Sequence, residues 1–262
     1  MQYEVSFAAD FKNLTSYFPE SEADSRFCNG FHSSWIAEKN CGKQPINFLN
    51  PATGGQTWRF MEWGCLPFNS TDPLISSRRW TFMLHTPAER IFGDVKSYWH
   101  RIRDQRCLIP ANGFYIQGTV QNMQHEVPYF LHVPDQPVFF LPVLYSTDEA
   151  LDMTTGQKTQ RWVFTMISKP ADCLAKHLDC DQEKSTTMPL LLPFSLSRHW
   201  LDHDLNEADY RSILDFEMSS EALQAWPIYS TQQEEQRPDN KEKNERFDWE
   251  KHAAVNVGTA IF

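Results

Sequence analysis

The 262-residue sequence lacks several features that would assign it to a particular class. No stretch approaches the roughly 20 consecutive apolar residues of a membrane-spanning helix. The first residues, Met1 to Val5, place no basic region before an apolar run, as a secretory signal would. The six cysteines form no C-x-x-C pair, and scattered thiols in an acidic chain without a leader are typical of buried small side chains rather than of a disulfide framework. We therefore expect a soluble, cytoplasmic protein.

The charge balance is acidic, with 24 Lys and Arg against 34 Asp and Glu and a net charge of −10. An acidic surface repels phosphate, whereas a nucleic-acid-binding protein usually shows a basic patch. Six arginines nevertheless fall close together in the sequence, at Arg78, Arg79, Arg90, Arg101, Arg103 and Arg106. Two interpretations fit this cluster: a local phosphate-binding groove, or a solvated surface with ordinary ion pairs.

Hydrophobic patterning predicts a β-rich α+β domain with short peripheral helices. The chain is 41% hydrophobic and 14% aromatic, which favours packed strands over a helical bundle. Alternation and apolar runs predict strands at 3–7, 58–63, 107–116 and 162–167, a hairpin formed by 129–133 and 138–141, and extended chain at 225–228. Helical spacing predicts helices at 9–18, 170–178, 195–200 and 207–214, the last with Asn206 as its N-cap, and residues 39–56 read as a loop.

The C-terminal part of the chain changes in composition. Residues 231–252 are dominated by Gln, Glu, Lys, Asn and Asp, which is typical of a solvated tail or linker. Residues 253–262 are apolar again and could dock on the body of the protein. We therefore expect one domain at 1–230 and a polar C-terminal extension at 231–262.

Segments in a fixed order resemble the SRAP family, the SOS response-associated peptidase-like proteins that process abasic sites. They are Trp63-Gly64-Cys65-Leu66-Pro67, the ten-residue run Arg106-Cys107-Leu108-Ile109-Pro110-Ala111-Asn112-Gly113-Phe114-Tyr115, Phe164-Thr165-Met166-Ile167 followed by Pro170-Ala171, and Met188-Pro189-Leu190-Leu191-Leu192. The resemblance covers about residues 1–230. It implies an SRAP-like fold with a central barrel-like sheet and a groove for single-stranded DNA.

The resemblance also implies a chemistry. In that family the initiator methionine is removed, and the exposed N-terminal cysteine attacks the aldehyde of an abasic site through its thiol and α-amine. An α-amine with a pKa of about 8 and a thiol with a pKa of about 8.5 are both usable nucleophiles near neutral pH. An Asn, a Glu and a His of the family site position the sugar and transfer protons.

This sequence departs from the family at most of those positions. Gln2 stands in place of the cysteine, and a residue of this size also disfavours removal of Met1. His85 replaces the family Asn, and Pro87 replaces an arginine that contacts DNA. Ile116 replaces the Glu and cannot transfer a proton.

The family His has no settled counterpart. His177 is the nearest histidine upstream of the Met188-Pro189 motif, while alignment without a gap gives Asp179 and counting back from the motif gives Ser185. His177 and His85 are therefore the candidate catalytic residues that remain. Cys173, His177 and Cys180 could suggest a metal site, but the irregular spacing and missing fourth ligand argue against it, and no metal or cofactor is predicted.

The candidate DNA-binding residues are Trp63, Arg78, Arg79 and Arg90. We expect Trp63 to line a groove, where its ring could stack on a base, and Phe114 to lie in the core. We expect the arginine cluster at 78–106 to contact phosphates.

The sequence thus predicts a degenerate SRAP-family protein that associates with single-stranded or abasic-site DNA in the DNA damage (SOS) response, without making the cysteine-based cross-link. Two alternatives stay open. One is a pseudoenzyme that binds a protein partner. The other is a residual abasic-site lyase that uses an amine such as that of Met1. No Cys–His or Ser–His arrangement supports a peptidase, and the sequence leaves the oligomeric state open.

Overall fold

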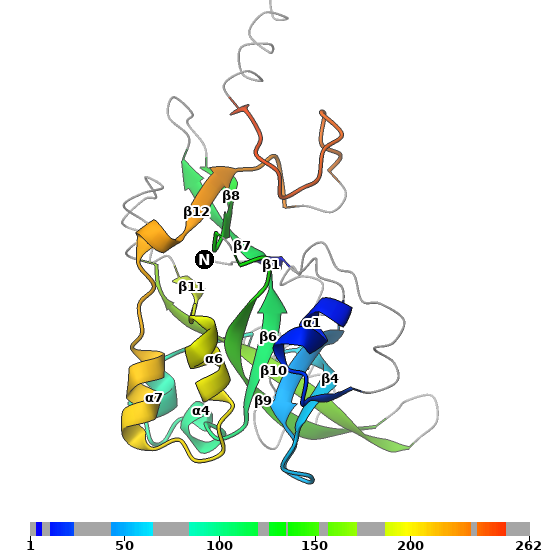
Figure 1. Cartoon of the computed structure of the whole chain (residues 1–262), viewed down its shortest axis with the longest axis vertical. Helices are drawn as coiled ribbons and strands as arrows, with labels where there is room; N and C mark the ends of the chain where they lie inside the picture. The colour runs from blue at the N-terminus through cyan, green and yellow to red at the C-terminus, as the bar shows by residue number, and fades with distance from the viewer. Residues whose placement is uncertain are drawn as a thin grey trace, which may run out of the picture.

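The computed structural model describes residues 4–6, 11–23, 43–64, 84–119, 126–134, 136–151, 157–171, 187–231 and 235–249. Its strands are β1 (Glu4–Ser6), β2 (Glu22–Ala23), β3 (Lys43–Leu49), β4 (Gln56–Trp63), β5 (His85–Pro87), β6 (Arg106–Ala111), β7 (Gly113–Thr119), β8 (Glu126–His132), β9 (Phe139–Leu151), β10 (Lys158–Pro170), β11 (Thr187–Pro189) and β12 (Gln224–Pro227). Its helices are α1 (Phe11–Tyr17), α3 (Glu89–Phe92), α4 (Tyr98–Arg101), α6 (Phe194–Trp200), α7 (Glu207–Leu214) and the 3-10 helix η4 (Ser220–Ala222). Figure 1 shows their arrangement.

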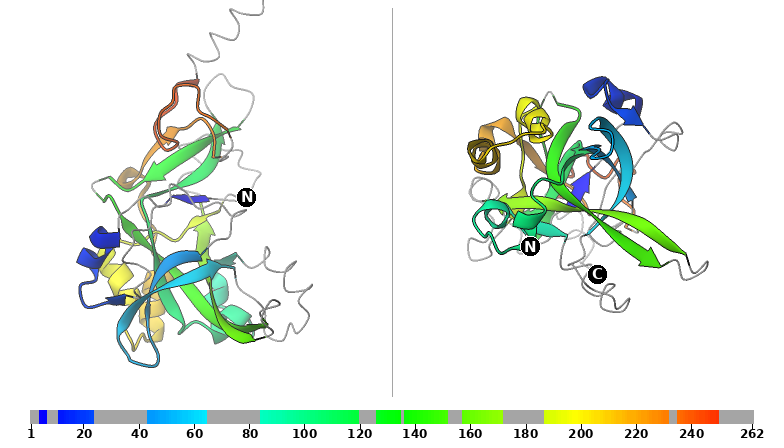
Figure 2. Two further views of the ribbon diagram at one scale, coloured as in Figure 1. Left: turned by 90° about the vertical axis from the view of Figure 1, so that its right-hand side faces the viewer. Right: turned by 90° about the horizontal axis from the view of Figure 1, so that it is seen from below.

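The larger sheet closes into a barrel. Its order is β11-β10-β9-β6-β3-β4-β2, and a parallel pairing of β10 with β4 joins Phe164 to Trp63 and closes a ring of five strands. Closure leaves the strands of the ring no open edge. The view from below in Figure 2 shows this ring with the helices outside it. The fold is therefore the β-rich α+β fold that the sequence patterns predict, with the barrel that the family resemblance implies.

A second, smaller sheet has the order β1-β7-β8-β12. The chain passes from the barrel into this sheet between β6 and β7, where the Asn112 N–H donates to the Ser6 carbonyl at 2.9 Å. Gly113 follows directly, and a Cβ there would lie 2.2 Å from the Phe130 ring. The Asn-Gly pair of the family motif thus marks the crossing between two sheets.

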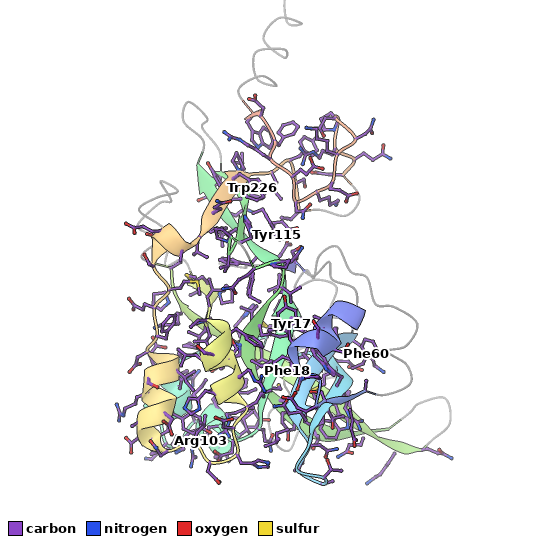
Figure 3. The ribbon with its side chains drawn as sticks, in the orientation of Figure 1. Tyr17, Phe18, Phe60, Arg103, Tyr115 and Trp226 are labelled. Carbon is purple, nitrogen blue, oxygen red and sulfur yellow. The ribbon has the colours of Figure 1, made fainter. Side chains whose placement is uncertain are left out.

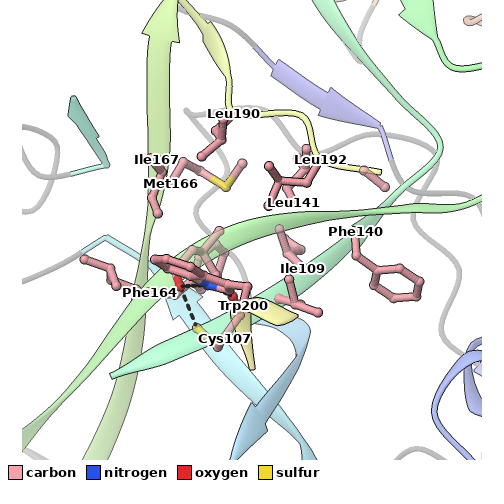
Figure 4. Packing of buried hydrophobic residues seen from close by; sticks show 14 of the residues in the cluster. Cys107, Ile109, Phe140, Leu141, Phe164, Met166, Ile167, Leu190, Leu192 and Trp200 are labelled. Atoms are coloured by element: carbon pink, nitrogen blue, oxygen red, sulfur yellow. Dashed lines mark hydrogen bonds between the residues drawn. The ribbon is translucent and has the colours of Figure 1, made fainter. Parts of the chain in front are cut away.

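Helix α6 is attached to the barrel by the Trp200 side chain. Trp200 is fully buried, and its indole N–H donates to the Cys107 carbonyl at 3.1 Å (Figure 4). Buried Phe164 and Leu192 belong to the same apolar cluster. Asn206 is the N-cap of helix α7, as the sequence predicts, and its side chain accepts from the N–H of Asp209 in a capping box.

Most of the predicted elements are present, and β1, α1, β4, β6, β7, β10, α6, α7 and β12 confirm their sequence patterns. Two expectations are wrong. Residues 43–49 are the strand β3 and not loop, because the barrel buries even polar Gln44 and Asn47. The expected hairpin is also absent, because β8 pairs with β7 and β12 whereas β9 pairs with β6 and β10. The expected helix at 170–178 lies outside the described residues except at its first two positions, 170 and 171.

Residues 235–249 are mostly exposed, as the expected solvated tail would be, but two of their side chains are buried. Arg237 and Phe247 are buried, with 6% and 3% of their surface exposed. The Phe247 N–H donates to the carbonyl of Pro227, the last residue of β12, at 2.8 Å. In both side views, this segment lies at the end of the molecule that carries the small sheet (Figures 1 and 2).

Within the described part of the chain, no helix has both the length and the apolar character that crossing a membrane requires.

Candidate functional site

The strand that carries His85 and the Met188-Pro189 motif both lie at one end of β10. Strand β5 pairs with β10 in parallel, and β11 pairs with it in antiparallel fashion. Ser168 is the shared residue, opposite Pro87 in β5 and Pro189 in β11. The fold therefore brings the strand of His85 and the Met188-Pro189 motif to the two sides of a single strand.

His85, which replaces the family Asn, is half-buried at the start of β5. Its ring meets the Trp63 ring edge to face, with centroids 5.6 Å apart. The side chain is not fully enclosed by this contact. His85 thus stays a candidate for contact with a ligand.

Trp63 is a core residue, and the expectation of a groove position is wrong. Only 1% of its surface is exposed, its ring stacks on Phe164 at an interplanar angle of 9°, and its indole N–H donates to the Leu84 carbonyl at 3.0 Å. Because this ring is buried and its donor is engaged inside the protein, it cannot stack on a base. Position 63 is buried because the β4–β10 pairing that closes the barrel runs through it.

Ile116, at the position of the family Glu, is packed into the main core with 2% of its surface exposed. It lies in β7 opposite Tyr129 of β8. On the other side of β7, β1 runs antiparallel, with Glu4 opposite Tyr115. The beginning of β1 therefore lies beside the position where the family carries its acid/base residue, and that position holds an apolar side chain.

Tyr115 occupies the opposite face of β7 and belongs to a separate small cluster with Phe130 and Ile228 (Figure 3). Burial, together with a smaller effect of the Glu4 carboxylate, raises the pKa of Tyr115 to about 12, against the lowering effect of a hydrogen bond with Ser6. The hydroxyl therefore stays protonated and cannot act as a base near neutral pH.

The predicted arginine cluster divides into different roles. Arg90 is exposed on α3, close behind β5 in the sequence, and Arg101 is exposed on α4 with its guanidinium 6.0 Å from the Tyr98 ring. Arg103 is half-buried and donates to the His100 carbonyl at 2.8 Å (Figure 3). Arg106 is only 5% exposed and is bonded inside the protein.

Arg106 links the barrel to the helices. Its Nε donates to the Trp200 carbonyl at 2.9 Å, and Nη2 donates to the carbonyls of Asp202 and His203. Nη1 donates to the Tyr210 hydroxyl. The expectation that Arg106 contacts phosphate is wrong, because its guanidinium is enclosed by these acceptors.

Several predicted residues lie outside the described part of the chain. They are Gln2, Arg78, Arg79, His177 and the two cysteines of the suggested metal site, Cys173 and Cys180. Among the residues that the structure does describe, no group of His, Cys, Asp and Glu side chains could hold a metal ion.

A hollow that the sequence did not predict lies behind the Met188-Pro189 motif. Its volume is about 120 Å³, and apolar side chains of β11 and of the segment after α7 line it, including Met188, Leu190, Phe216 and Met218. Lys169 borders it and donates to the Phe216 carbonyl at 3.1 Å. This contact fixes the amine of Lys169 in a structural bond.

Solved structures confirm the fold class. A protein from Bacteroides thetaiotaomicron superposes with a TM-score of 0.71 at 21% identity, covering 92% of this chain and 96% of that one. A protein from Bordetella bronchiseptica superposes with a TM-score of 0.63 at 15% identity, covering 88% of this chain and 100% of that one. A phage-related protein from the same organism gives 0.56 at 16% identity, covering 88% and 95%. No curated protein matches the sequence.

The barrel with its attached small sheet thus defines a known class of fold. A family model described as SOS response associated peptidase (SRAP) matches residues 22–233, which is most of the chain. The chain belongs to the SRAP family.

Proposed function

We propose that this protein binds single-stranded DNA, including DNA with an abasic site, in the response to DNA damage, and that it forms no cysteine-based cross-link. Membership of the SRAP family supports the association with DNA. The burial of Ile116 supports the absence of a cross-link, because the position of the family acid/base residue holds an apolar side chain inside the core. Gln2 supplies no thiol.

DNA binding in this proposal is non-covalent and electrostatic. Arg90 is exposed on the helix that directly follows His85, so a phosphate chain passing β5 could meet both side chains. Arg78 and Arg79, which lie outside the described residues, are proposed from the sequence as further phosphate contacts. Contacts to phosphates release counterions, which makes the affinity fall steeply as salt is added.

A native gel titration with a single-stranded oligonucleotide at several salt concentrations tests the proposal. Replacing Arg90 by Gln removes one phosphate contact, so we expect the slope of log K against log salt to become shallower by roughly 0.7. Arg198→Gln is the matched control, because Arg198 is exposed on α6 and paired with Glu20 at 2.8 Å. Equal slopes for wild type and Arg90→Gln would show that Arg90 does not contact the DNA phosphates. Absence of any retardation would favour the alternative of a protein-binding pseudoenzyme.

A further inference from the structure

The barrel has a second end, where β9 and β10 continue beyond the ring as a two-stranded ribbon (Figure 2). Trp162 and Tyr145 lie at the base of this ribbon, and their rings stack with centroids 5.7 Å apart. Ser168, which lies opposite Pro87 and Pro189, belongs to the other end of β10. It lies six residues beyond Trp162, a distance of about 20 Å in an extended strand. The ribbon end is therefore separate from the end that carries the family motifs.

Strand register places the two rings inside the barrel. Tyr145 lies opposite Phe164 in β10, and Trp162 precedes Phe164 by two residues, so the three share one face. Leu144, the neighbour of Tyr145, lies opposite Arg106, whose guanidinium reaches α6 outside the ring. Because side chains alternate along a strand, Tyr145 and Trp162 point the other way, into the barrel.

Arg59 of β4 lies on the same inner face. The Trp58 ring contacts Phe18, which follows α1 on the outside of the barrel, with centroids 6.2 Å apart. The neighbours of Trp58, Thr57 and Arg59, therefore point inward. The Arg59 guanidinium lies over the Trp162 ring, 4.4 Å from its centroid. An arginine stacked on an aromatic face still presents the N–H groups along the edge of its fork to a further partner.

Arg59 has a donor that the described protein groups leave unused. Its Nε is buried and has no hydrogen-bond partner among the described residues. The carboxylate of β4, Glu62, points to the outer face and pairs with Lys43 at 4.0 Å. Arg106 and Arg237, by contrast, each donate to several backbone carbonyls. A buried donor without an acceptor costs free energy, so Arg59 is suited to an acceptor that comes from outside the chain.

Other polar groups at this end are unused in the same way. The Thr57 hydroxyl and the Gln105 side-chain carbonyl are buried and have no hydrogen-bond partner within the described part of the chain. Phe48 lies opposite Thr57, and its ring contacts the Tyr145 ring with centroids 5.3 Å apart. Gln105 adjoins the same tyrosine, because its backbone carbonyl accepts from the Tyr145 N–H at 2.9 Å. Burial raises the pKa of Tyr145 to about 12, so its hydroxyl stays protonated and can donate.

We propose that the ribbon end of the barrel binds a small oxyanion, a phosphate or a carboxylate group, on the Arg59 guanidinium. The planar fork of arginine donates two parallel hydrogen bonds to such a group, and the Trp162 ring holds the fork in one orientation. The Thr57 hydroxyl and the Gln105 carbonyl are available to the other polar atoms of the ligand. The net charge of −10 disfavours unspecific retention of anions, so uptake here depends on this arrangement.

Isothermal titration calorimetry at constant ionic strength tests the site with inorganic phosphate, with acetate and with chloride as the salt control. We expect saturable binding of phosphate, of acetate or of both, and no saturable binding of chloride. Phosphate alone would identify a phosphate ligand, and acetate alone a carboxylate ligand. Each of these patterns supports the site.

Variants at position 59 assign the binding to the arginine. Arg59→Gln should weaken binding about tenfold or more, because both charge-assisted hydrogen bonds are lost. Arg59→Lys keeps the charge without the fork, so its affinity should lie between those of Arg59→Gln and wild type. Arg198→Gln is the matched control and should keep the wild-type affinity, because Arg198 is exposed on α6. A readout that needs no variant is the Arg59 Nε–H resonance in a nitrogen–proton correlation spectrum, which should shift on titration with the oxyanion that binds.

Equal affinities in wild type and Arg59→Gln would mean an adventitious ion only and would overturn the proposal. Binding of chloride as tight as that of the oxyanions would also overturn it, as would an unchanged Arg59 resonance or no saturable binding of either oxyanion. These results are independent of the proposed DNA binding, because phosphate and acetate are titrated without DNA and Arg90 is left intact.

Discussion

The barrel and the C-terminal segment on the small sheet each contain a buried arginine that donates to several backbone carbonyls. Arg106 joins β6 to the ends of α6 and α7, within a large continuous apolar core. Arg237 organises residues 235–249, where Phe247 is the buried apolar residue. In the barrel, the buried arginine therefore adds hydrogen bonds to an existing apolar core. In the C-terminal segment, the hydrogen bonds of the buried arginine take the place of such a core. Loss of each arginine should have different consequences for global and local stability.

The largest expected effect is that of Arg106→Met. The substitution leaves the carbonyls of Trp200 and Asp202 without their buried donor, so we expect the free energy of unfolding to fall by about 3–5 kcal/mol. Urea denaturation followed by tryptophan fluorescence measures it. The exposed Arg198→Met is the control and should change stability by about 1 kcal/mol or less. A similar small loss in Arg106→Met would show that Arg106 does not hold the helices to the barrel.

A more local effect is expected for Arg237→Met. Hydrogen exchange in residues 235–249 should accelerate strongly, corresponding to a loss of about 1.5–3 kcal/mol in the free energy of local opening. The barrel strands should keep their protection, as should both regions in the exposed control Lys241→Met. If Arg237→Met weakened the barrel as much as Arg106→Met, the distinction between the two regions would be lost.

The smallest effect is the pH dependence, which we expect to run in opposite directions in the two regions. Hydrogen bonds to Asp202 raise the pKa of His199 in the helical layer, with a smaller contribution from Asp209. The stability that the folded protein gains from this raised pKa is complete below the unfolded pKa of about 6.5. It is lost as pH rises through the pKa of His199 in the folded protein. In His199→Gln, the thermal unfolding midpoint should no longer fall as pH rises through this range. A midpoint that depends equally on pH in both proteins would exclude this histidine.

In the C-terminal segment the sign is reversed. The hydrogen bonds from Arg237 hold the pKa of Asp239 at about 2. The stability that Asp239 contributes to the folded segment is therefore present above the unfolded pKa of 3.8 and is lost as pH falls through about 2. Exchange in 235–249 should accelerate on acidification before that of the barrel, and Asp239→Asn should abolish the difference.

Sequence patterns predicted the elements in which local signals and tertiary contacts agree. The apolar run of β10 and the N-cap at Asn206 are examples, and the motif at 106–115 indicated the family fold. Strand β3 was missed because its polar residues are buried by the barrel, where the Asn47 side chain donates to the Ser21 hydroxyl at 3.0 Å. The false hairpin arose because strand pairing across two sheets is not encoded in the local turn.

The candidate site was predicted in part. The replacements at His85 and Ile116 were evident from the motifs, but the burial of Trp63 depends on its pairing with a distant strand. The packing of residues 235–249 depends on bonds from Arg237 and Trp226 to backbone carbonyls. Hydrogen bonds of this kind produce no hydrophobic periodicity in the sequence. The polar composition of the segment therefore indicated a tail.

The central claim is that this SRAP chain binds DNA without the cysteine-based cross-link. The most direct measurement mixes the protein with single-stranded DNA that carries one abasic site and compares a native gel with a denaturing gel, with no reducing agent added. The account predicts retardation on the native gel and no protein–DNA band on the denaturing gel. A denaturation-resistant band without reductant would contradict it.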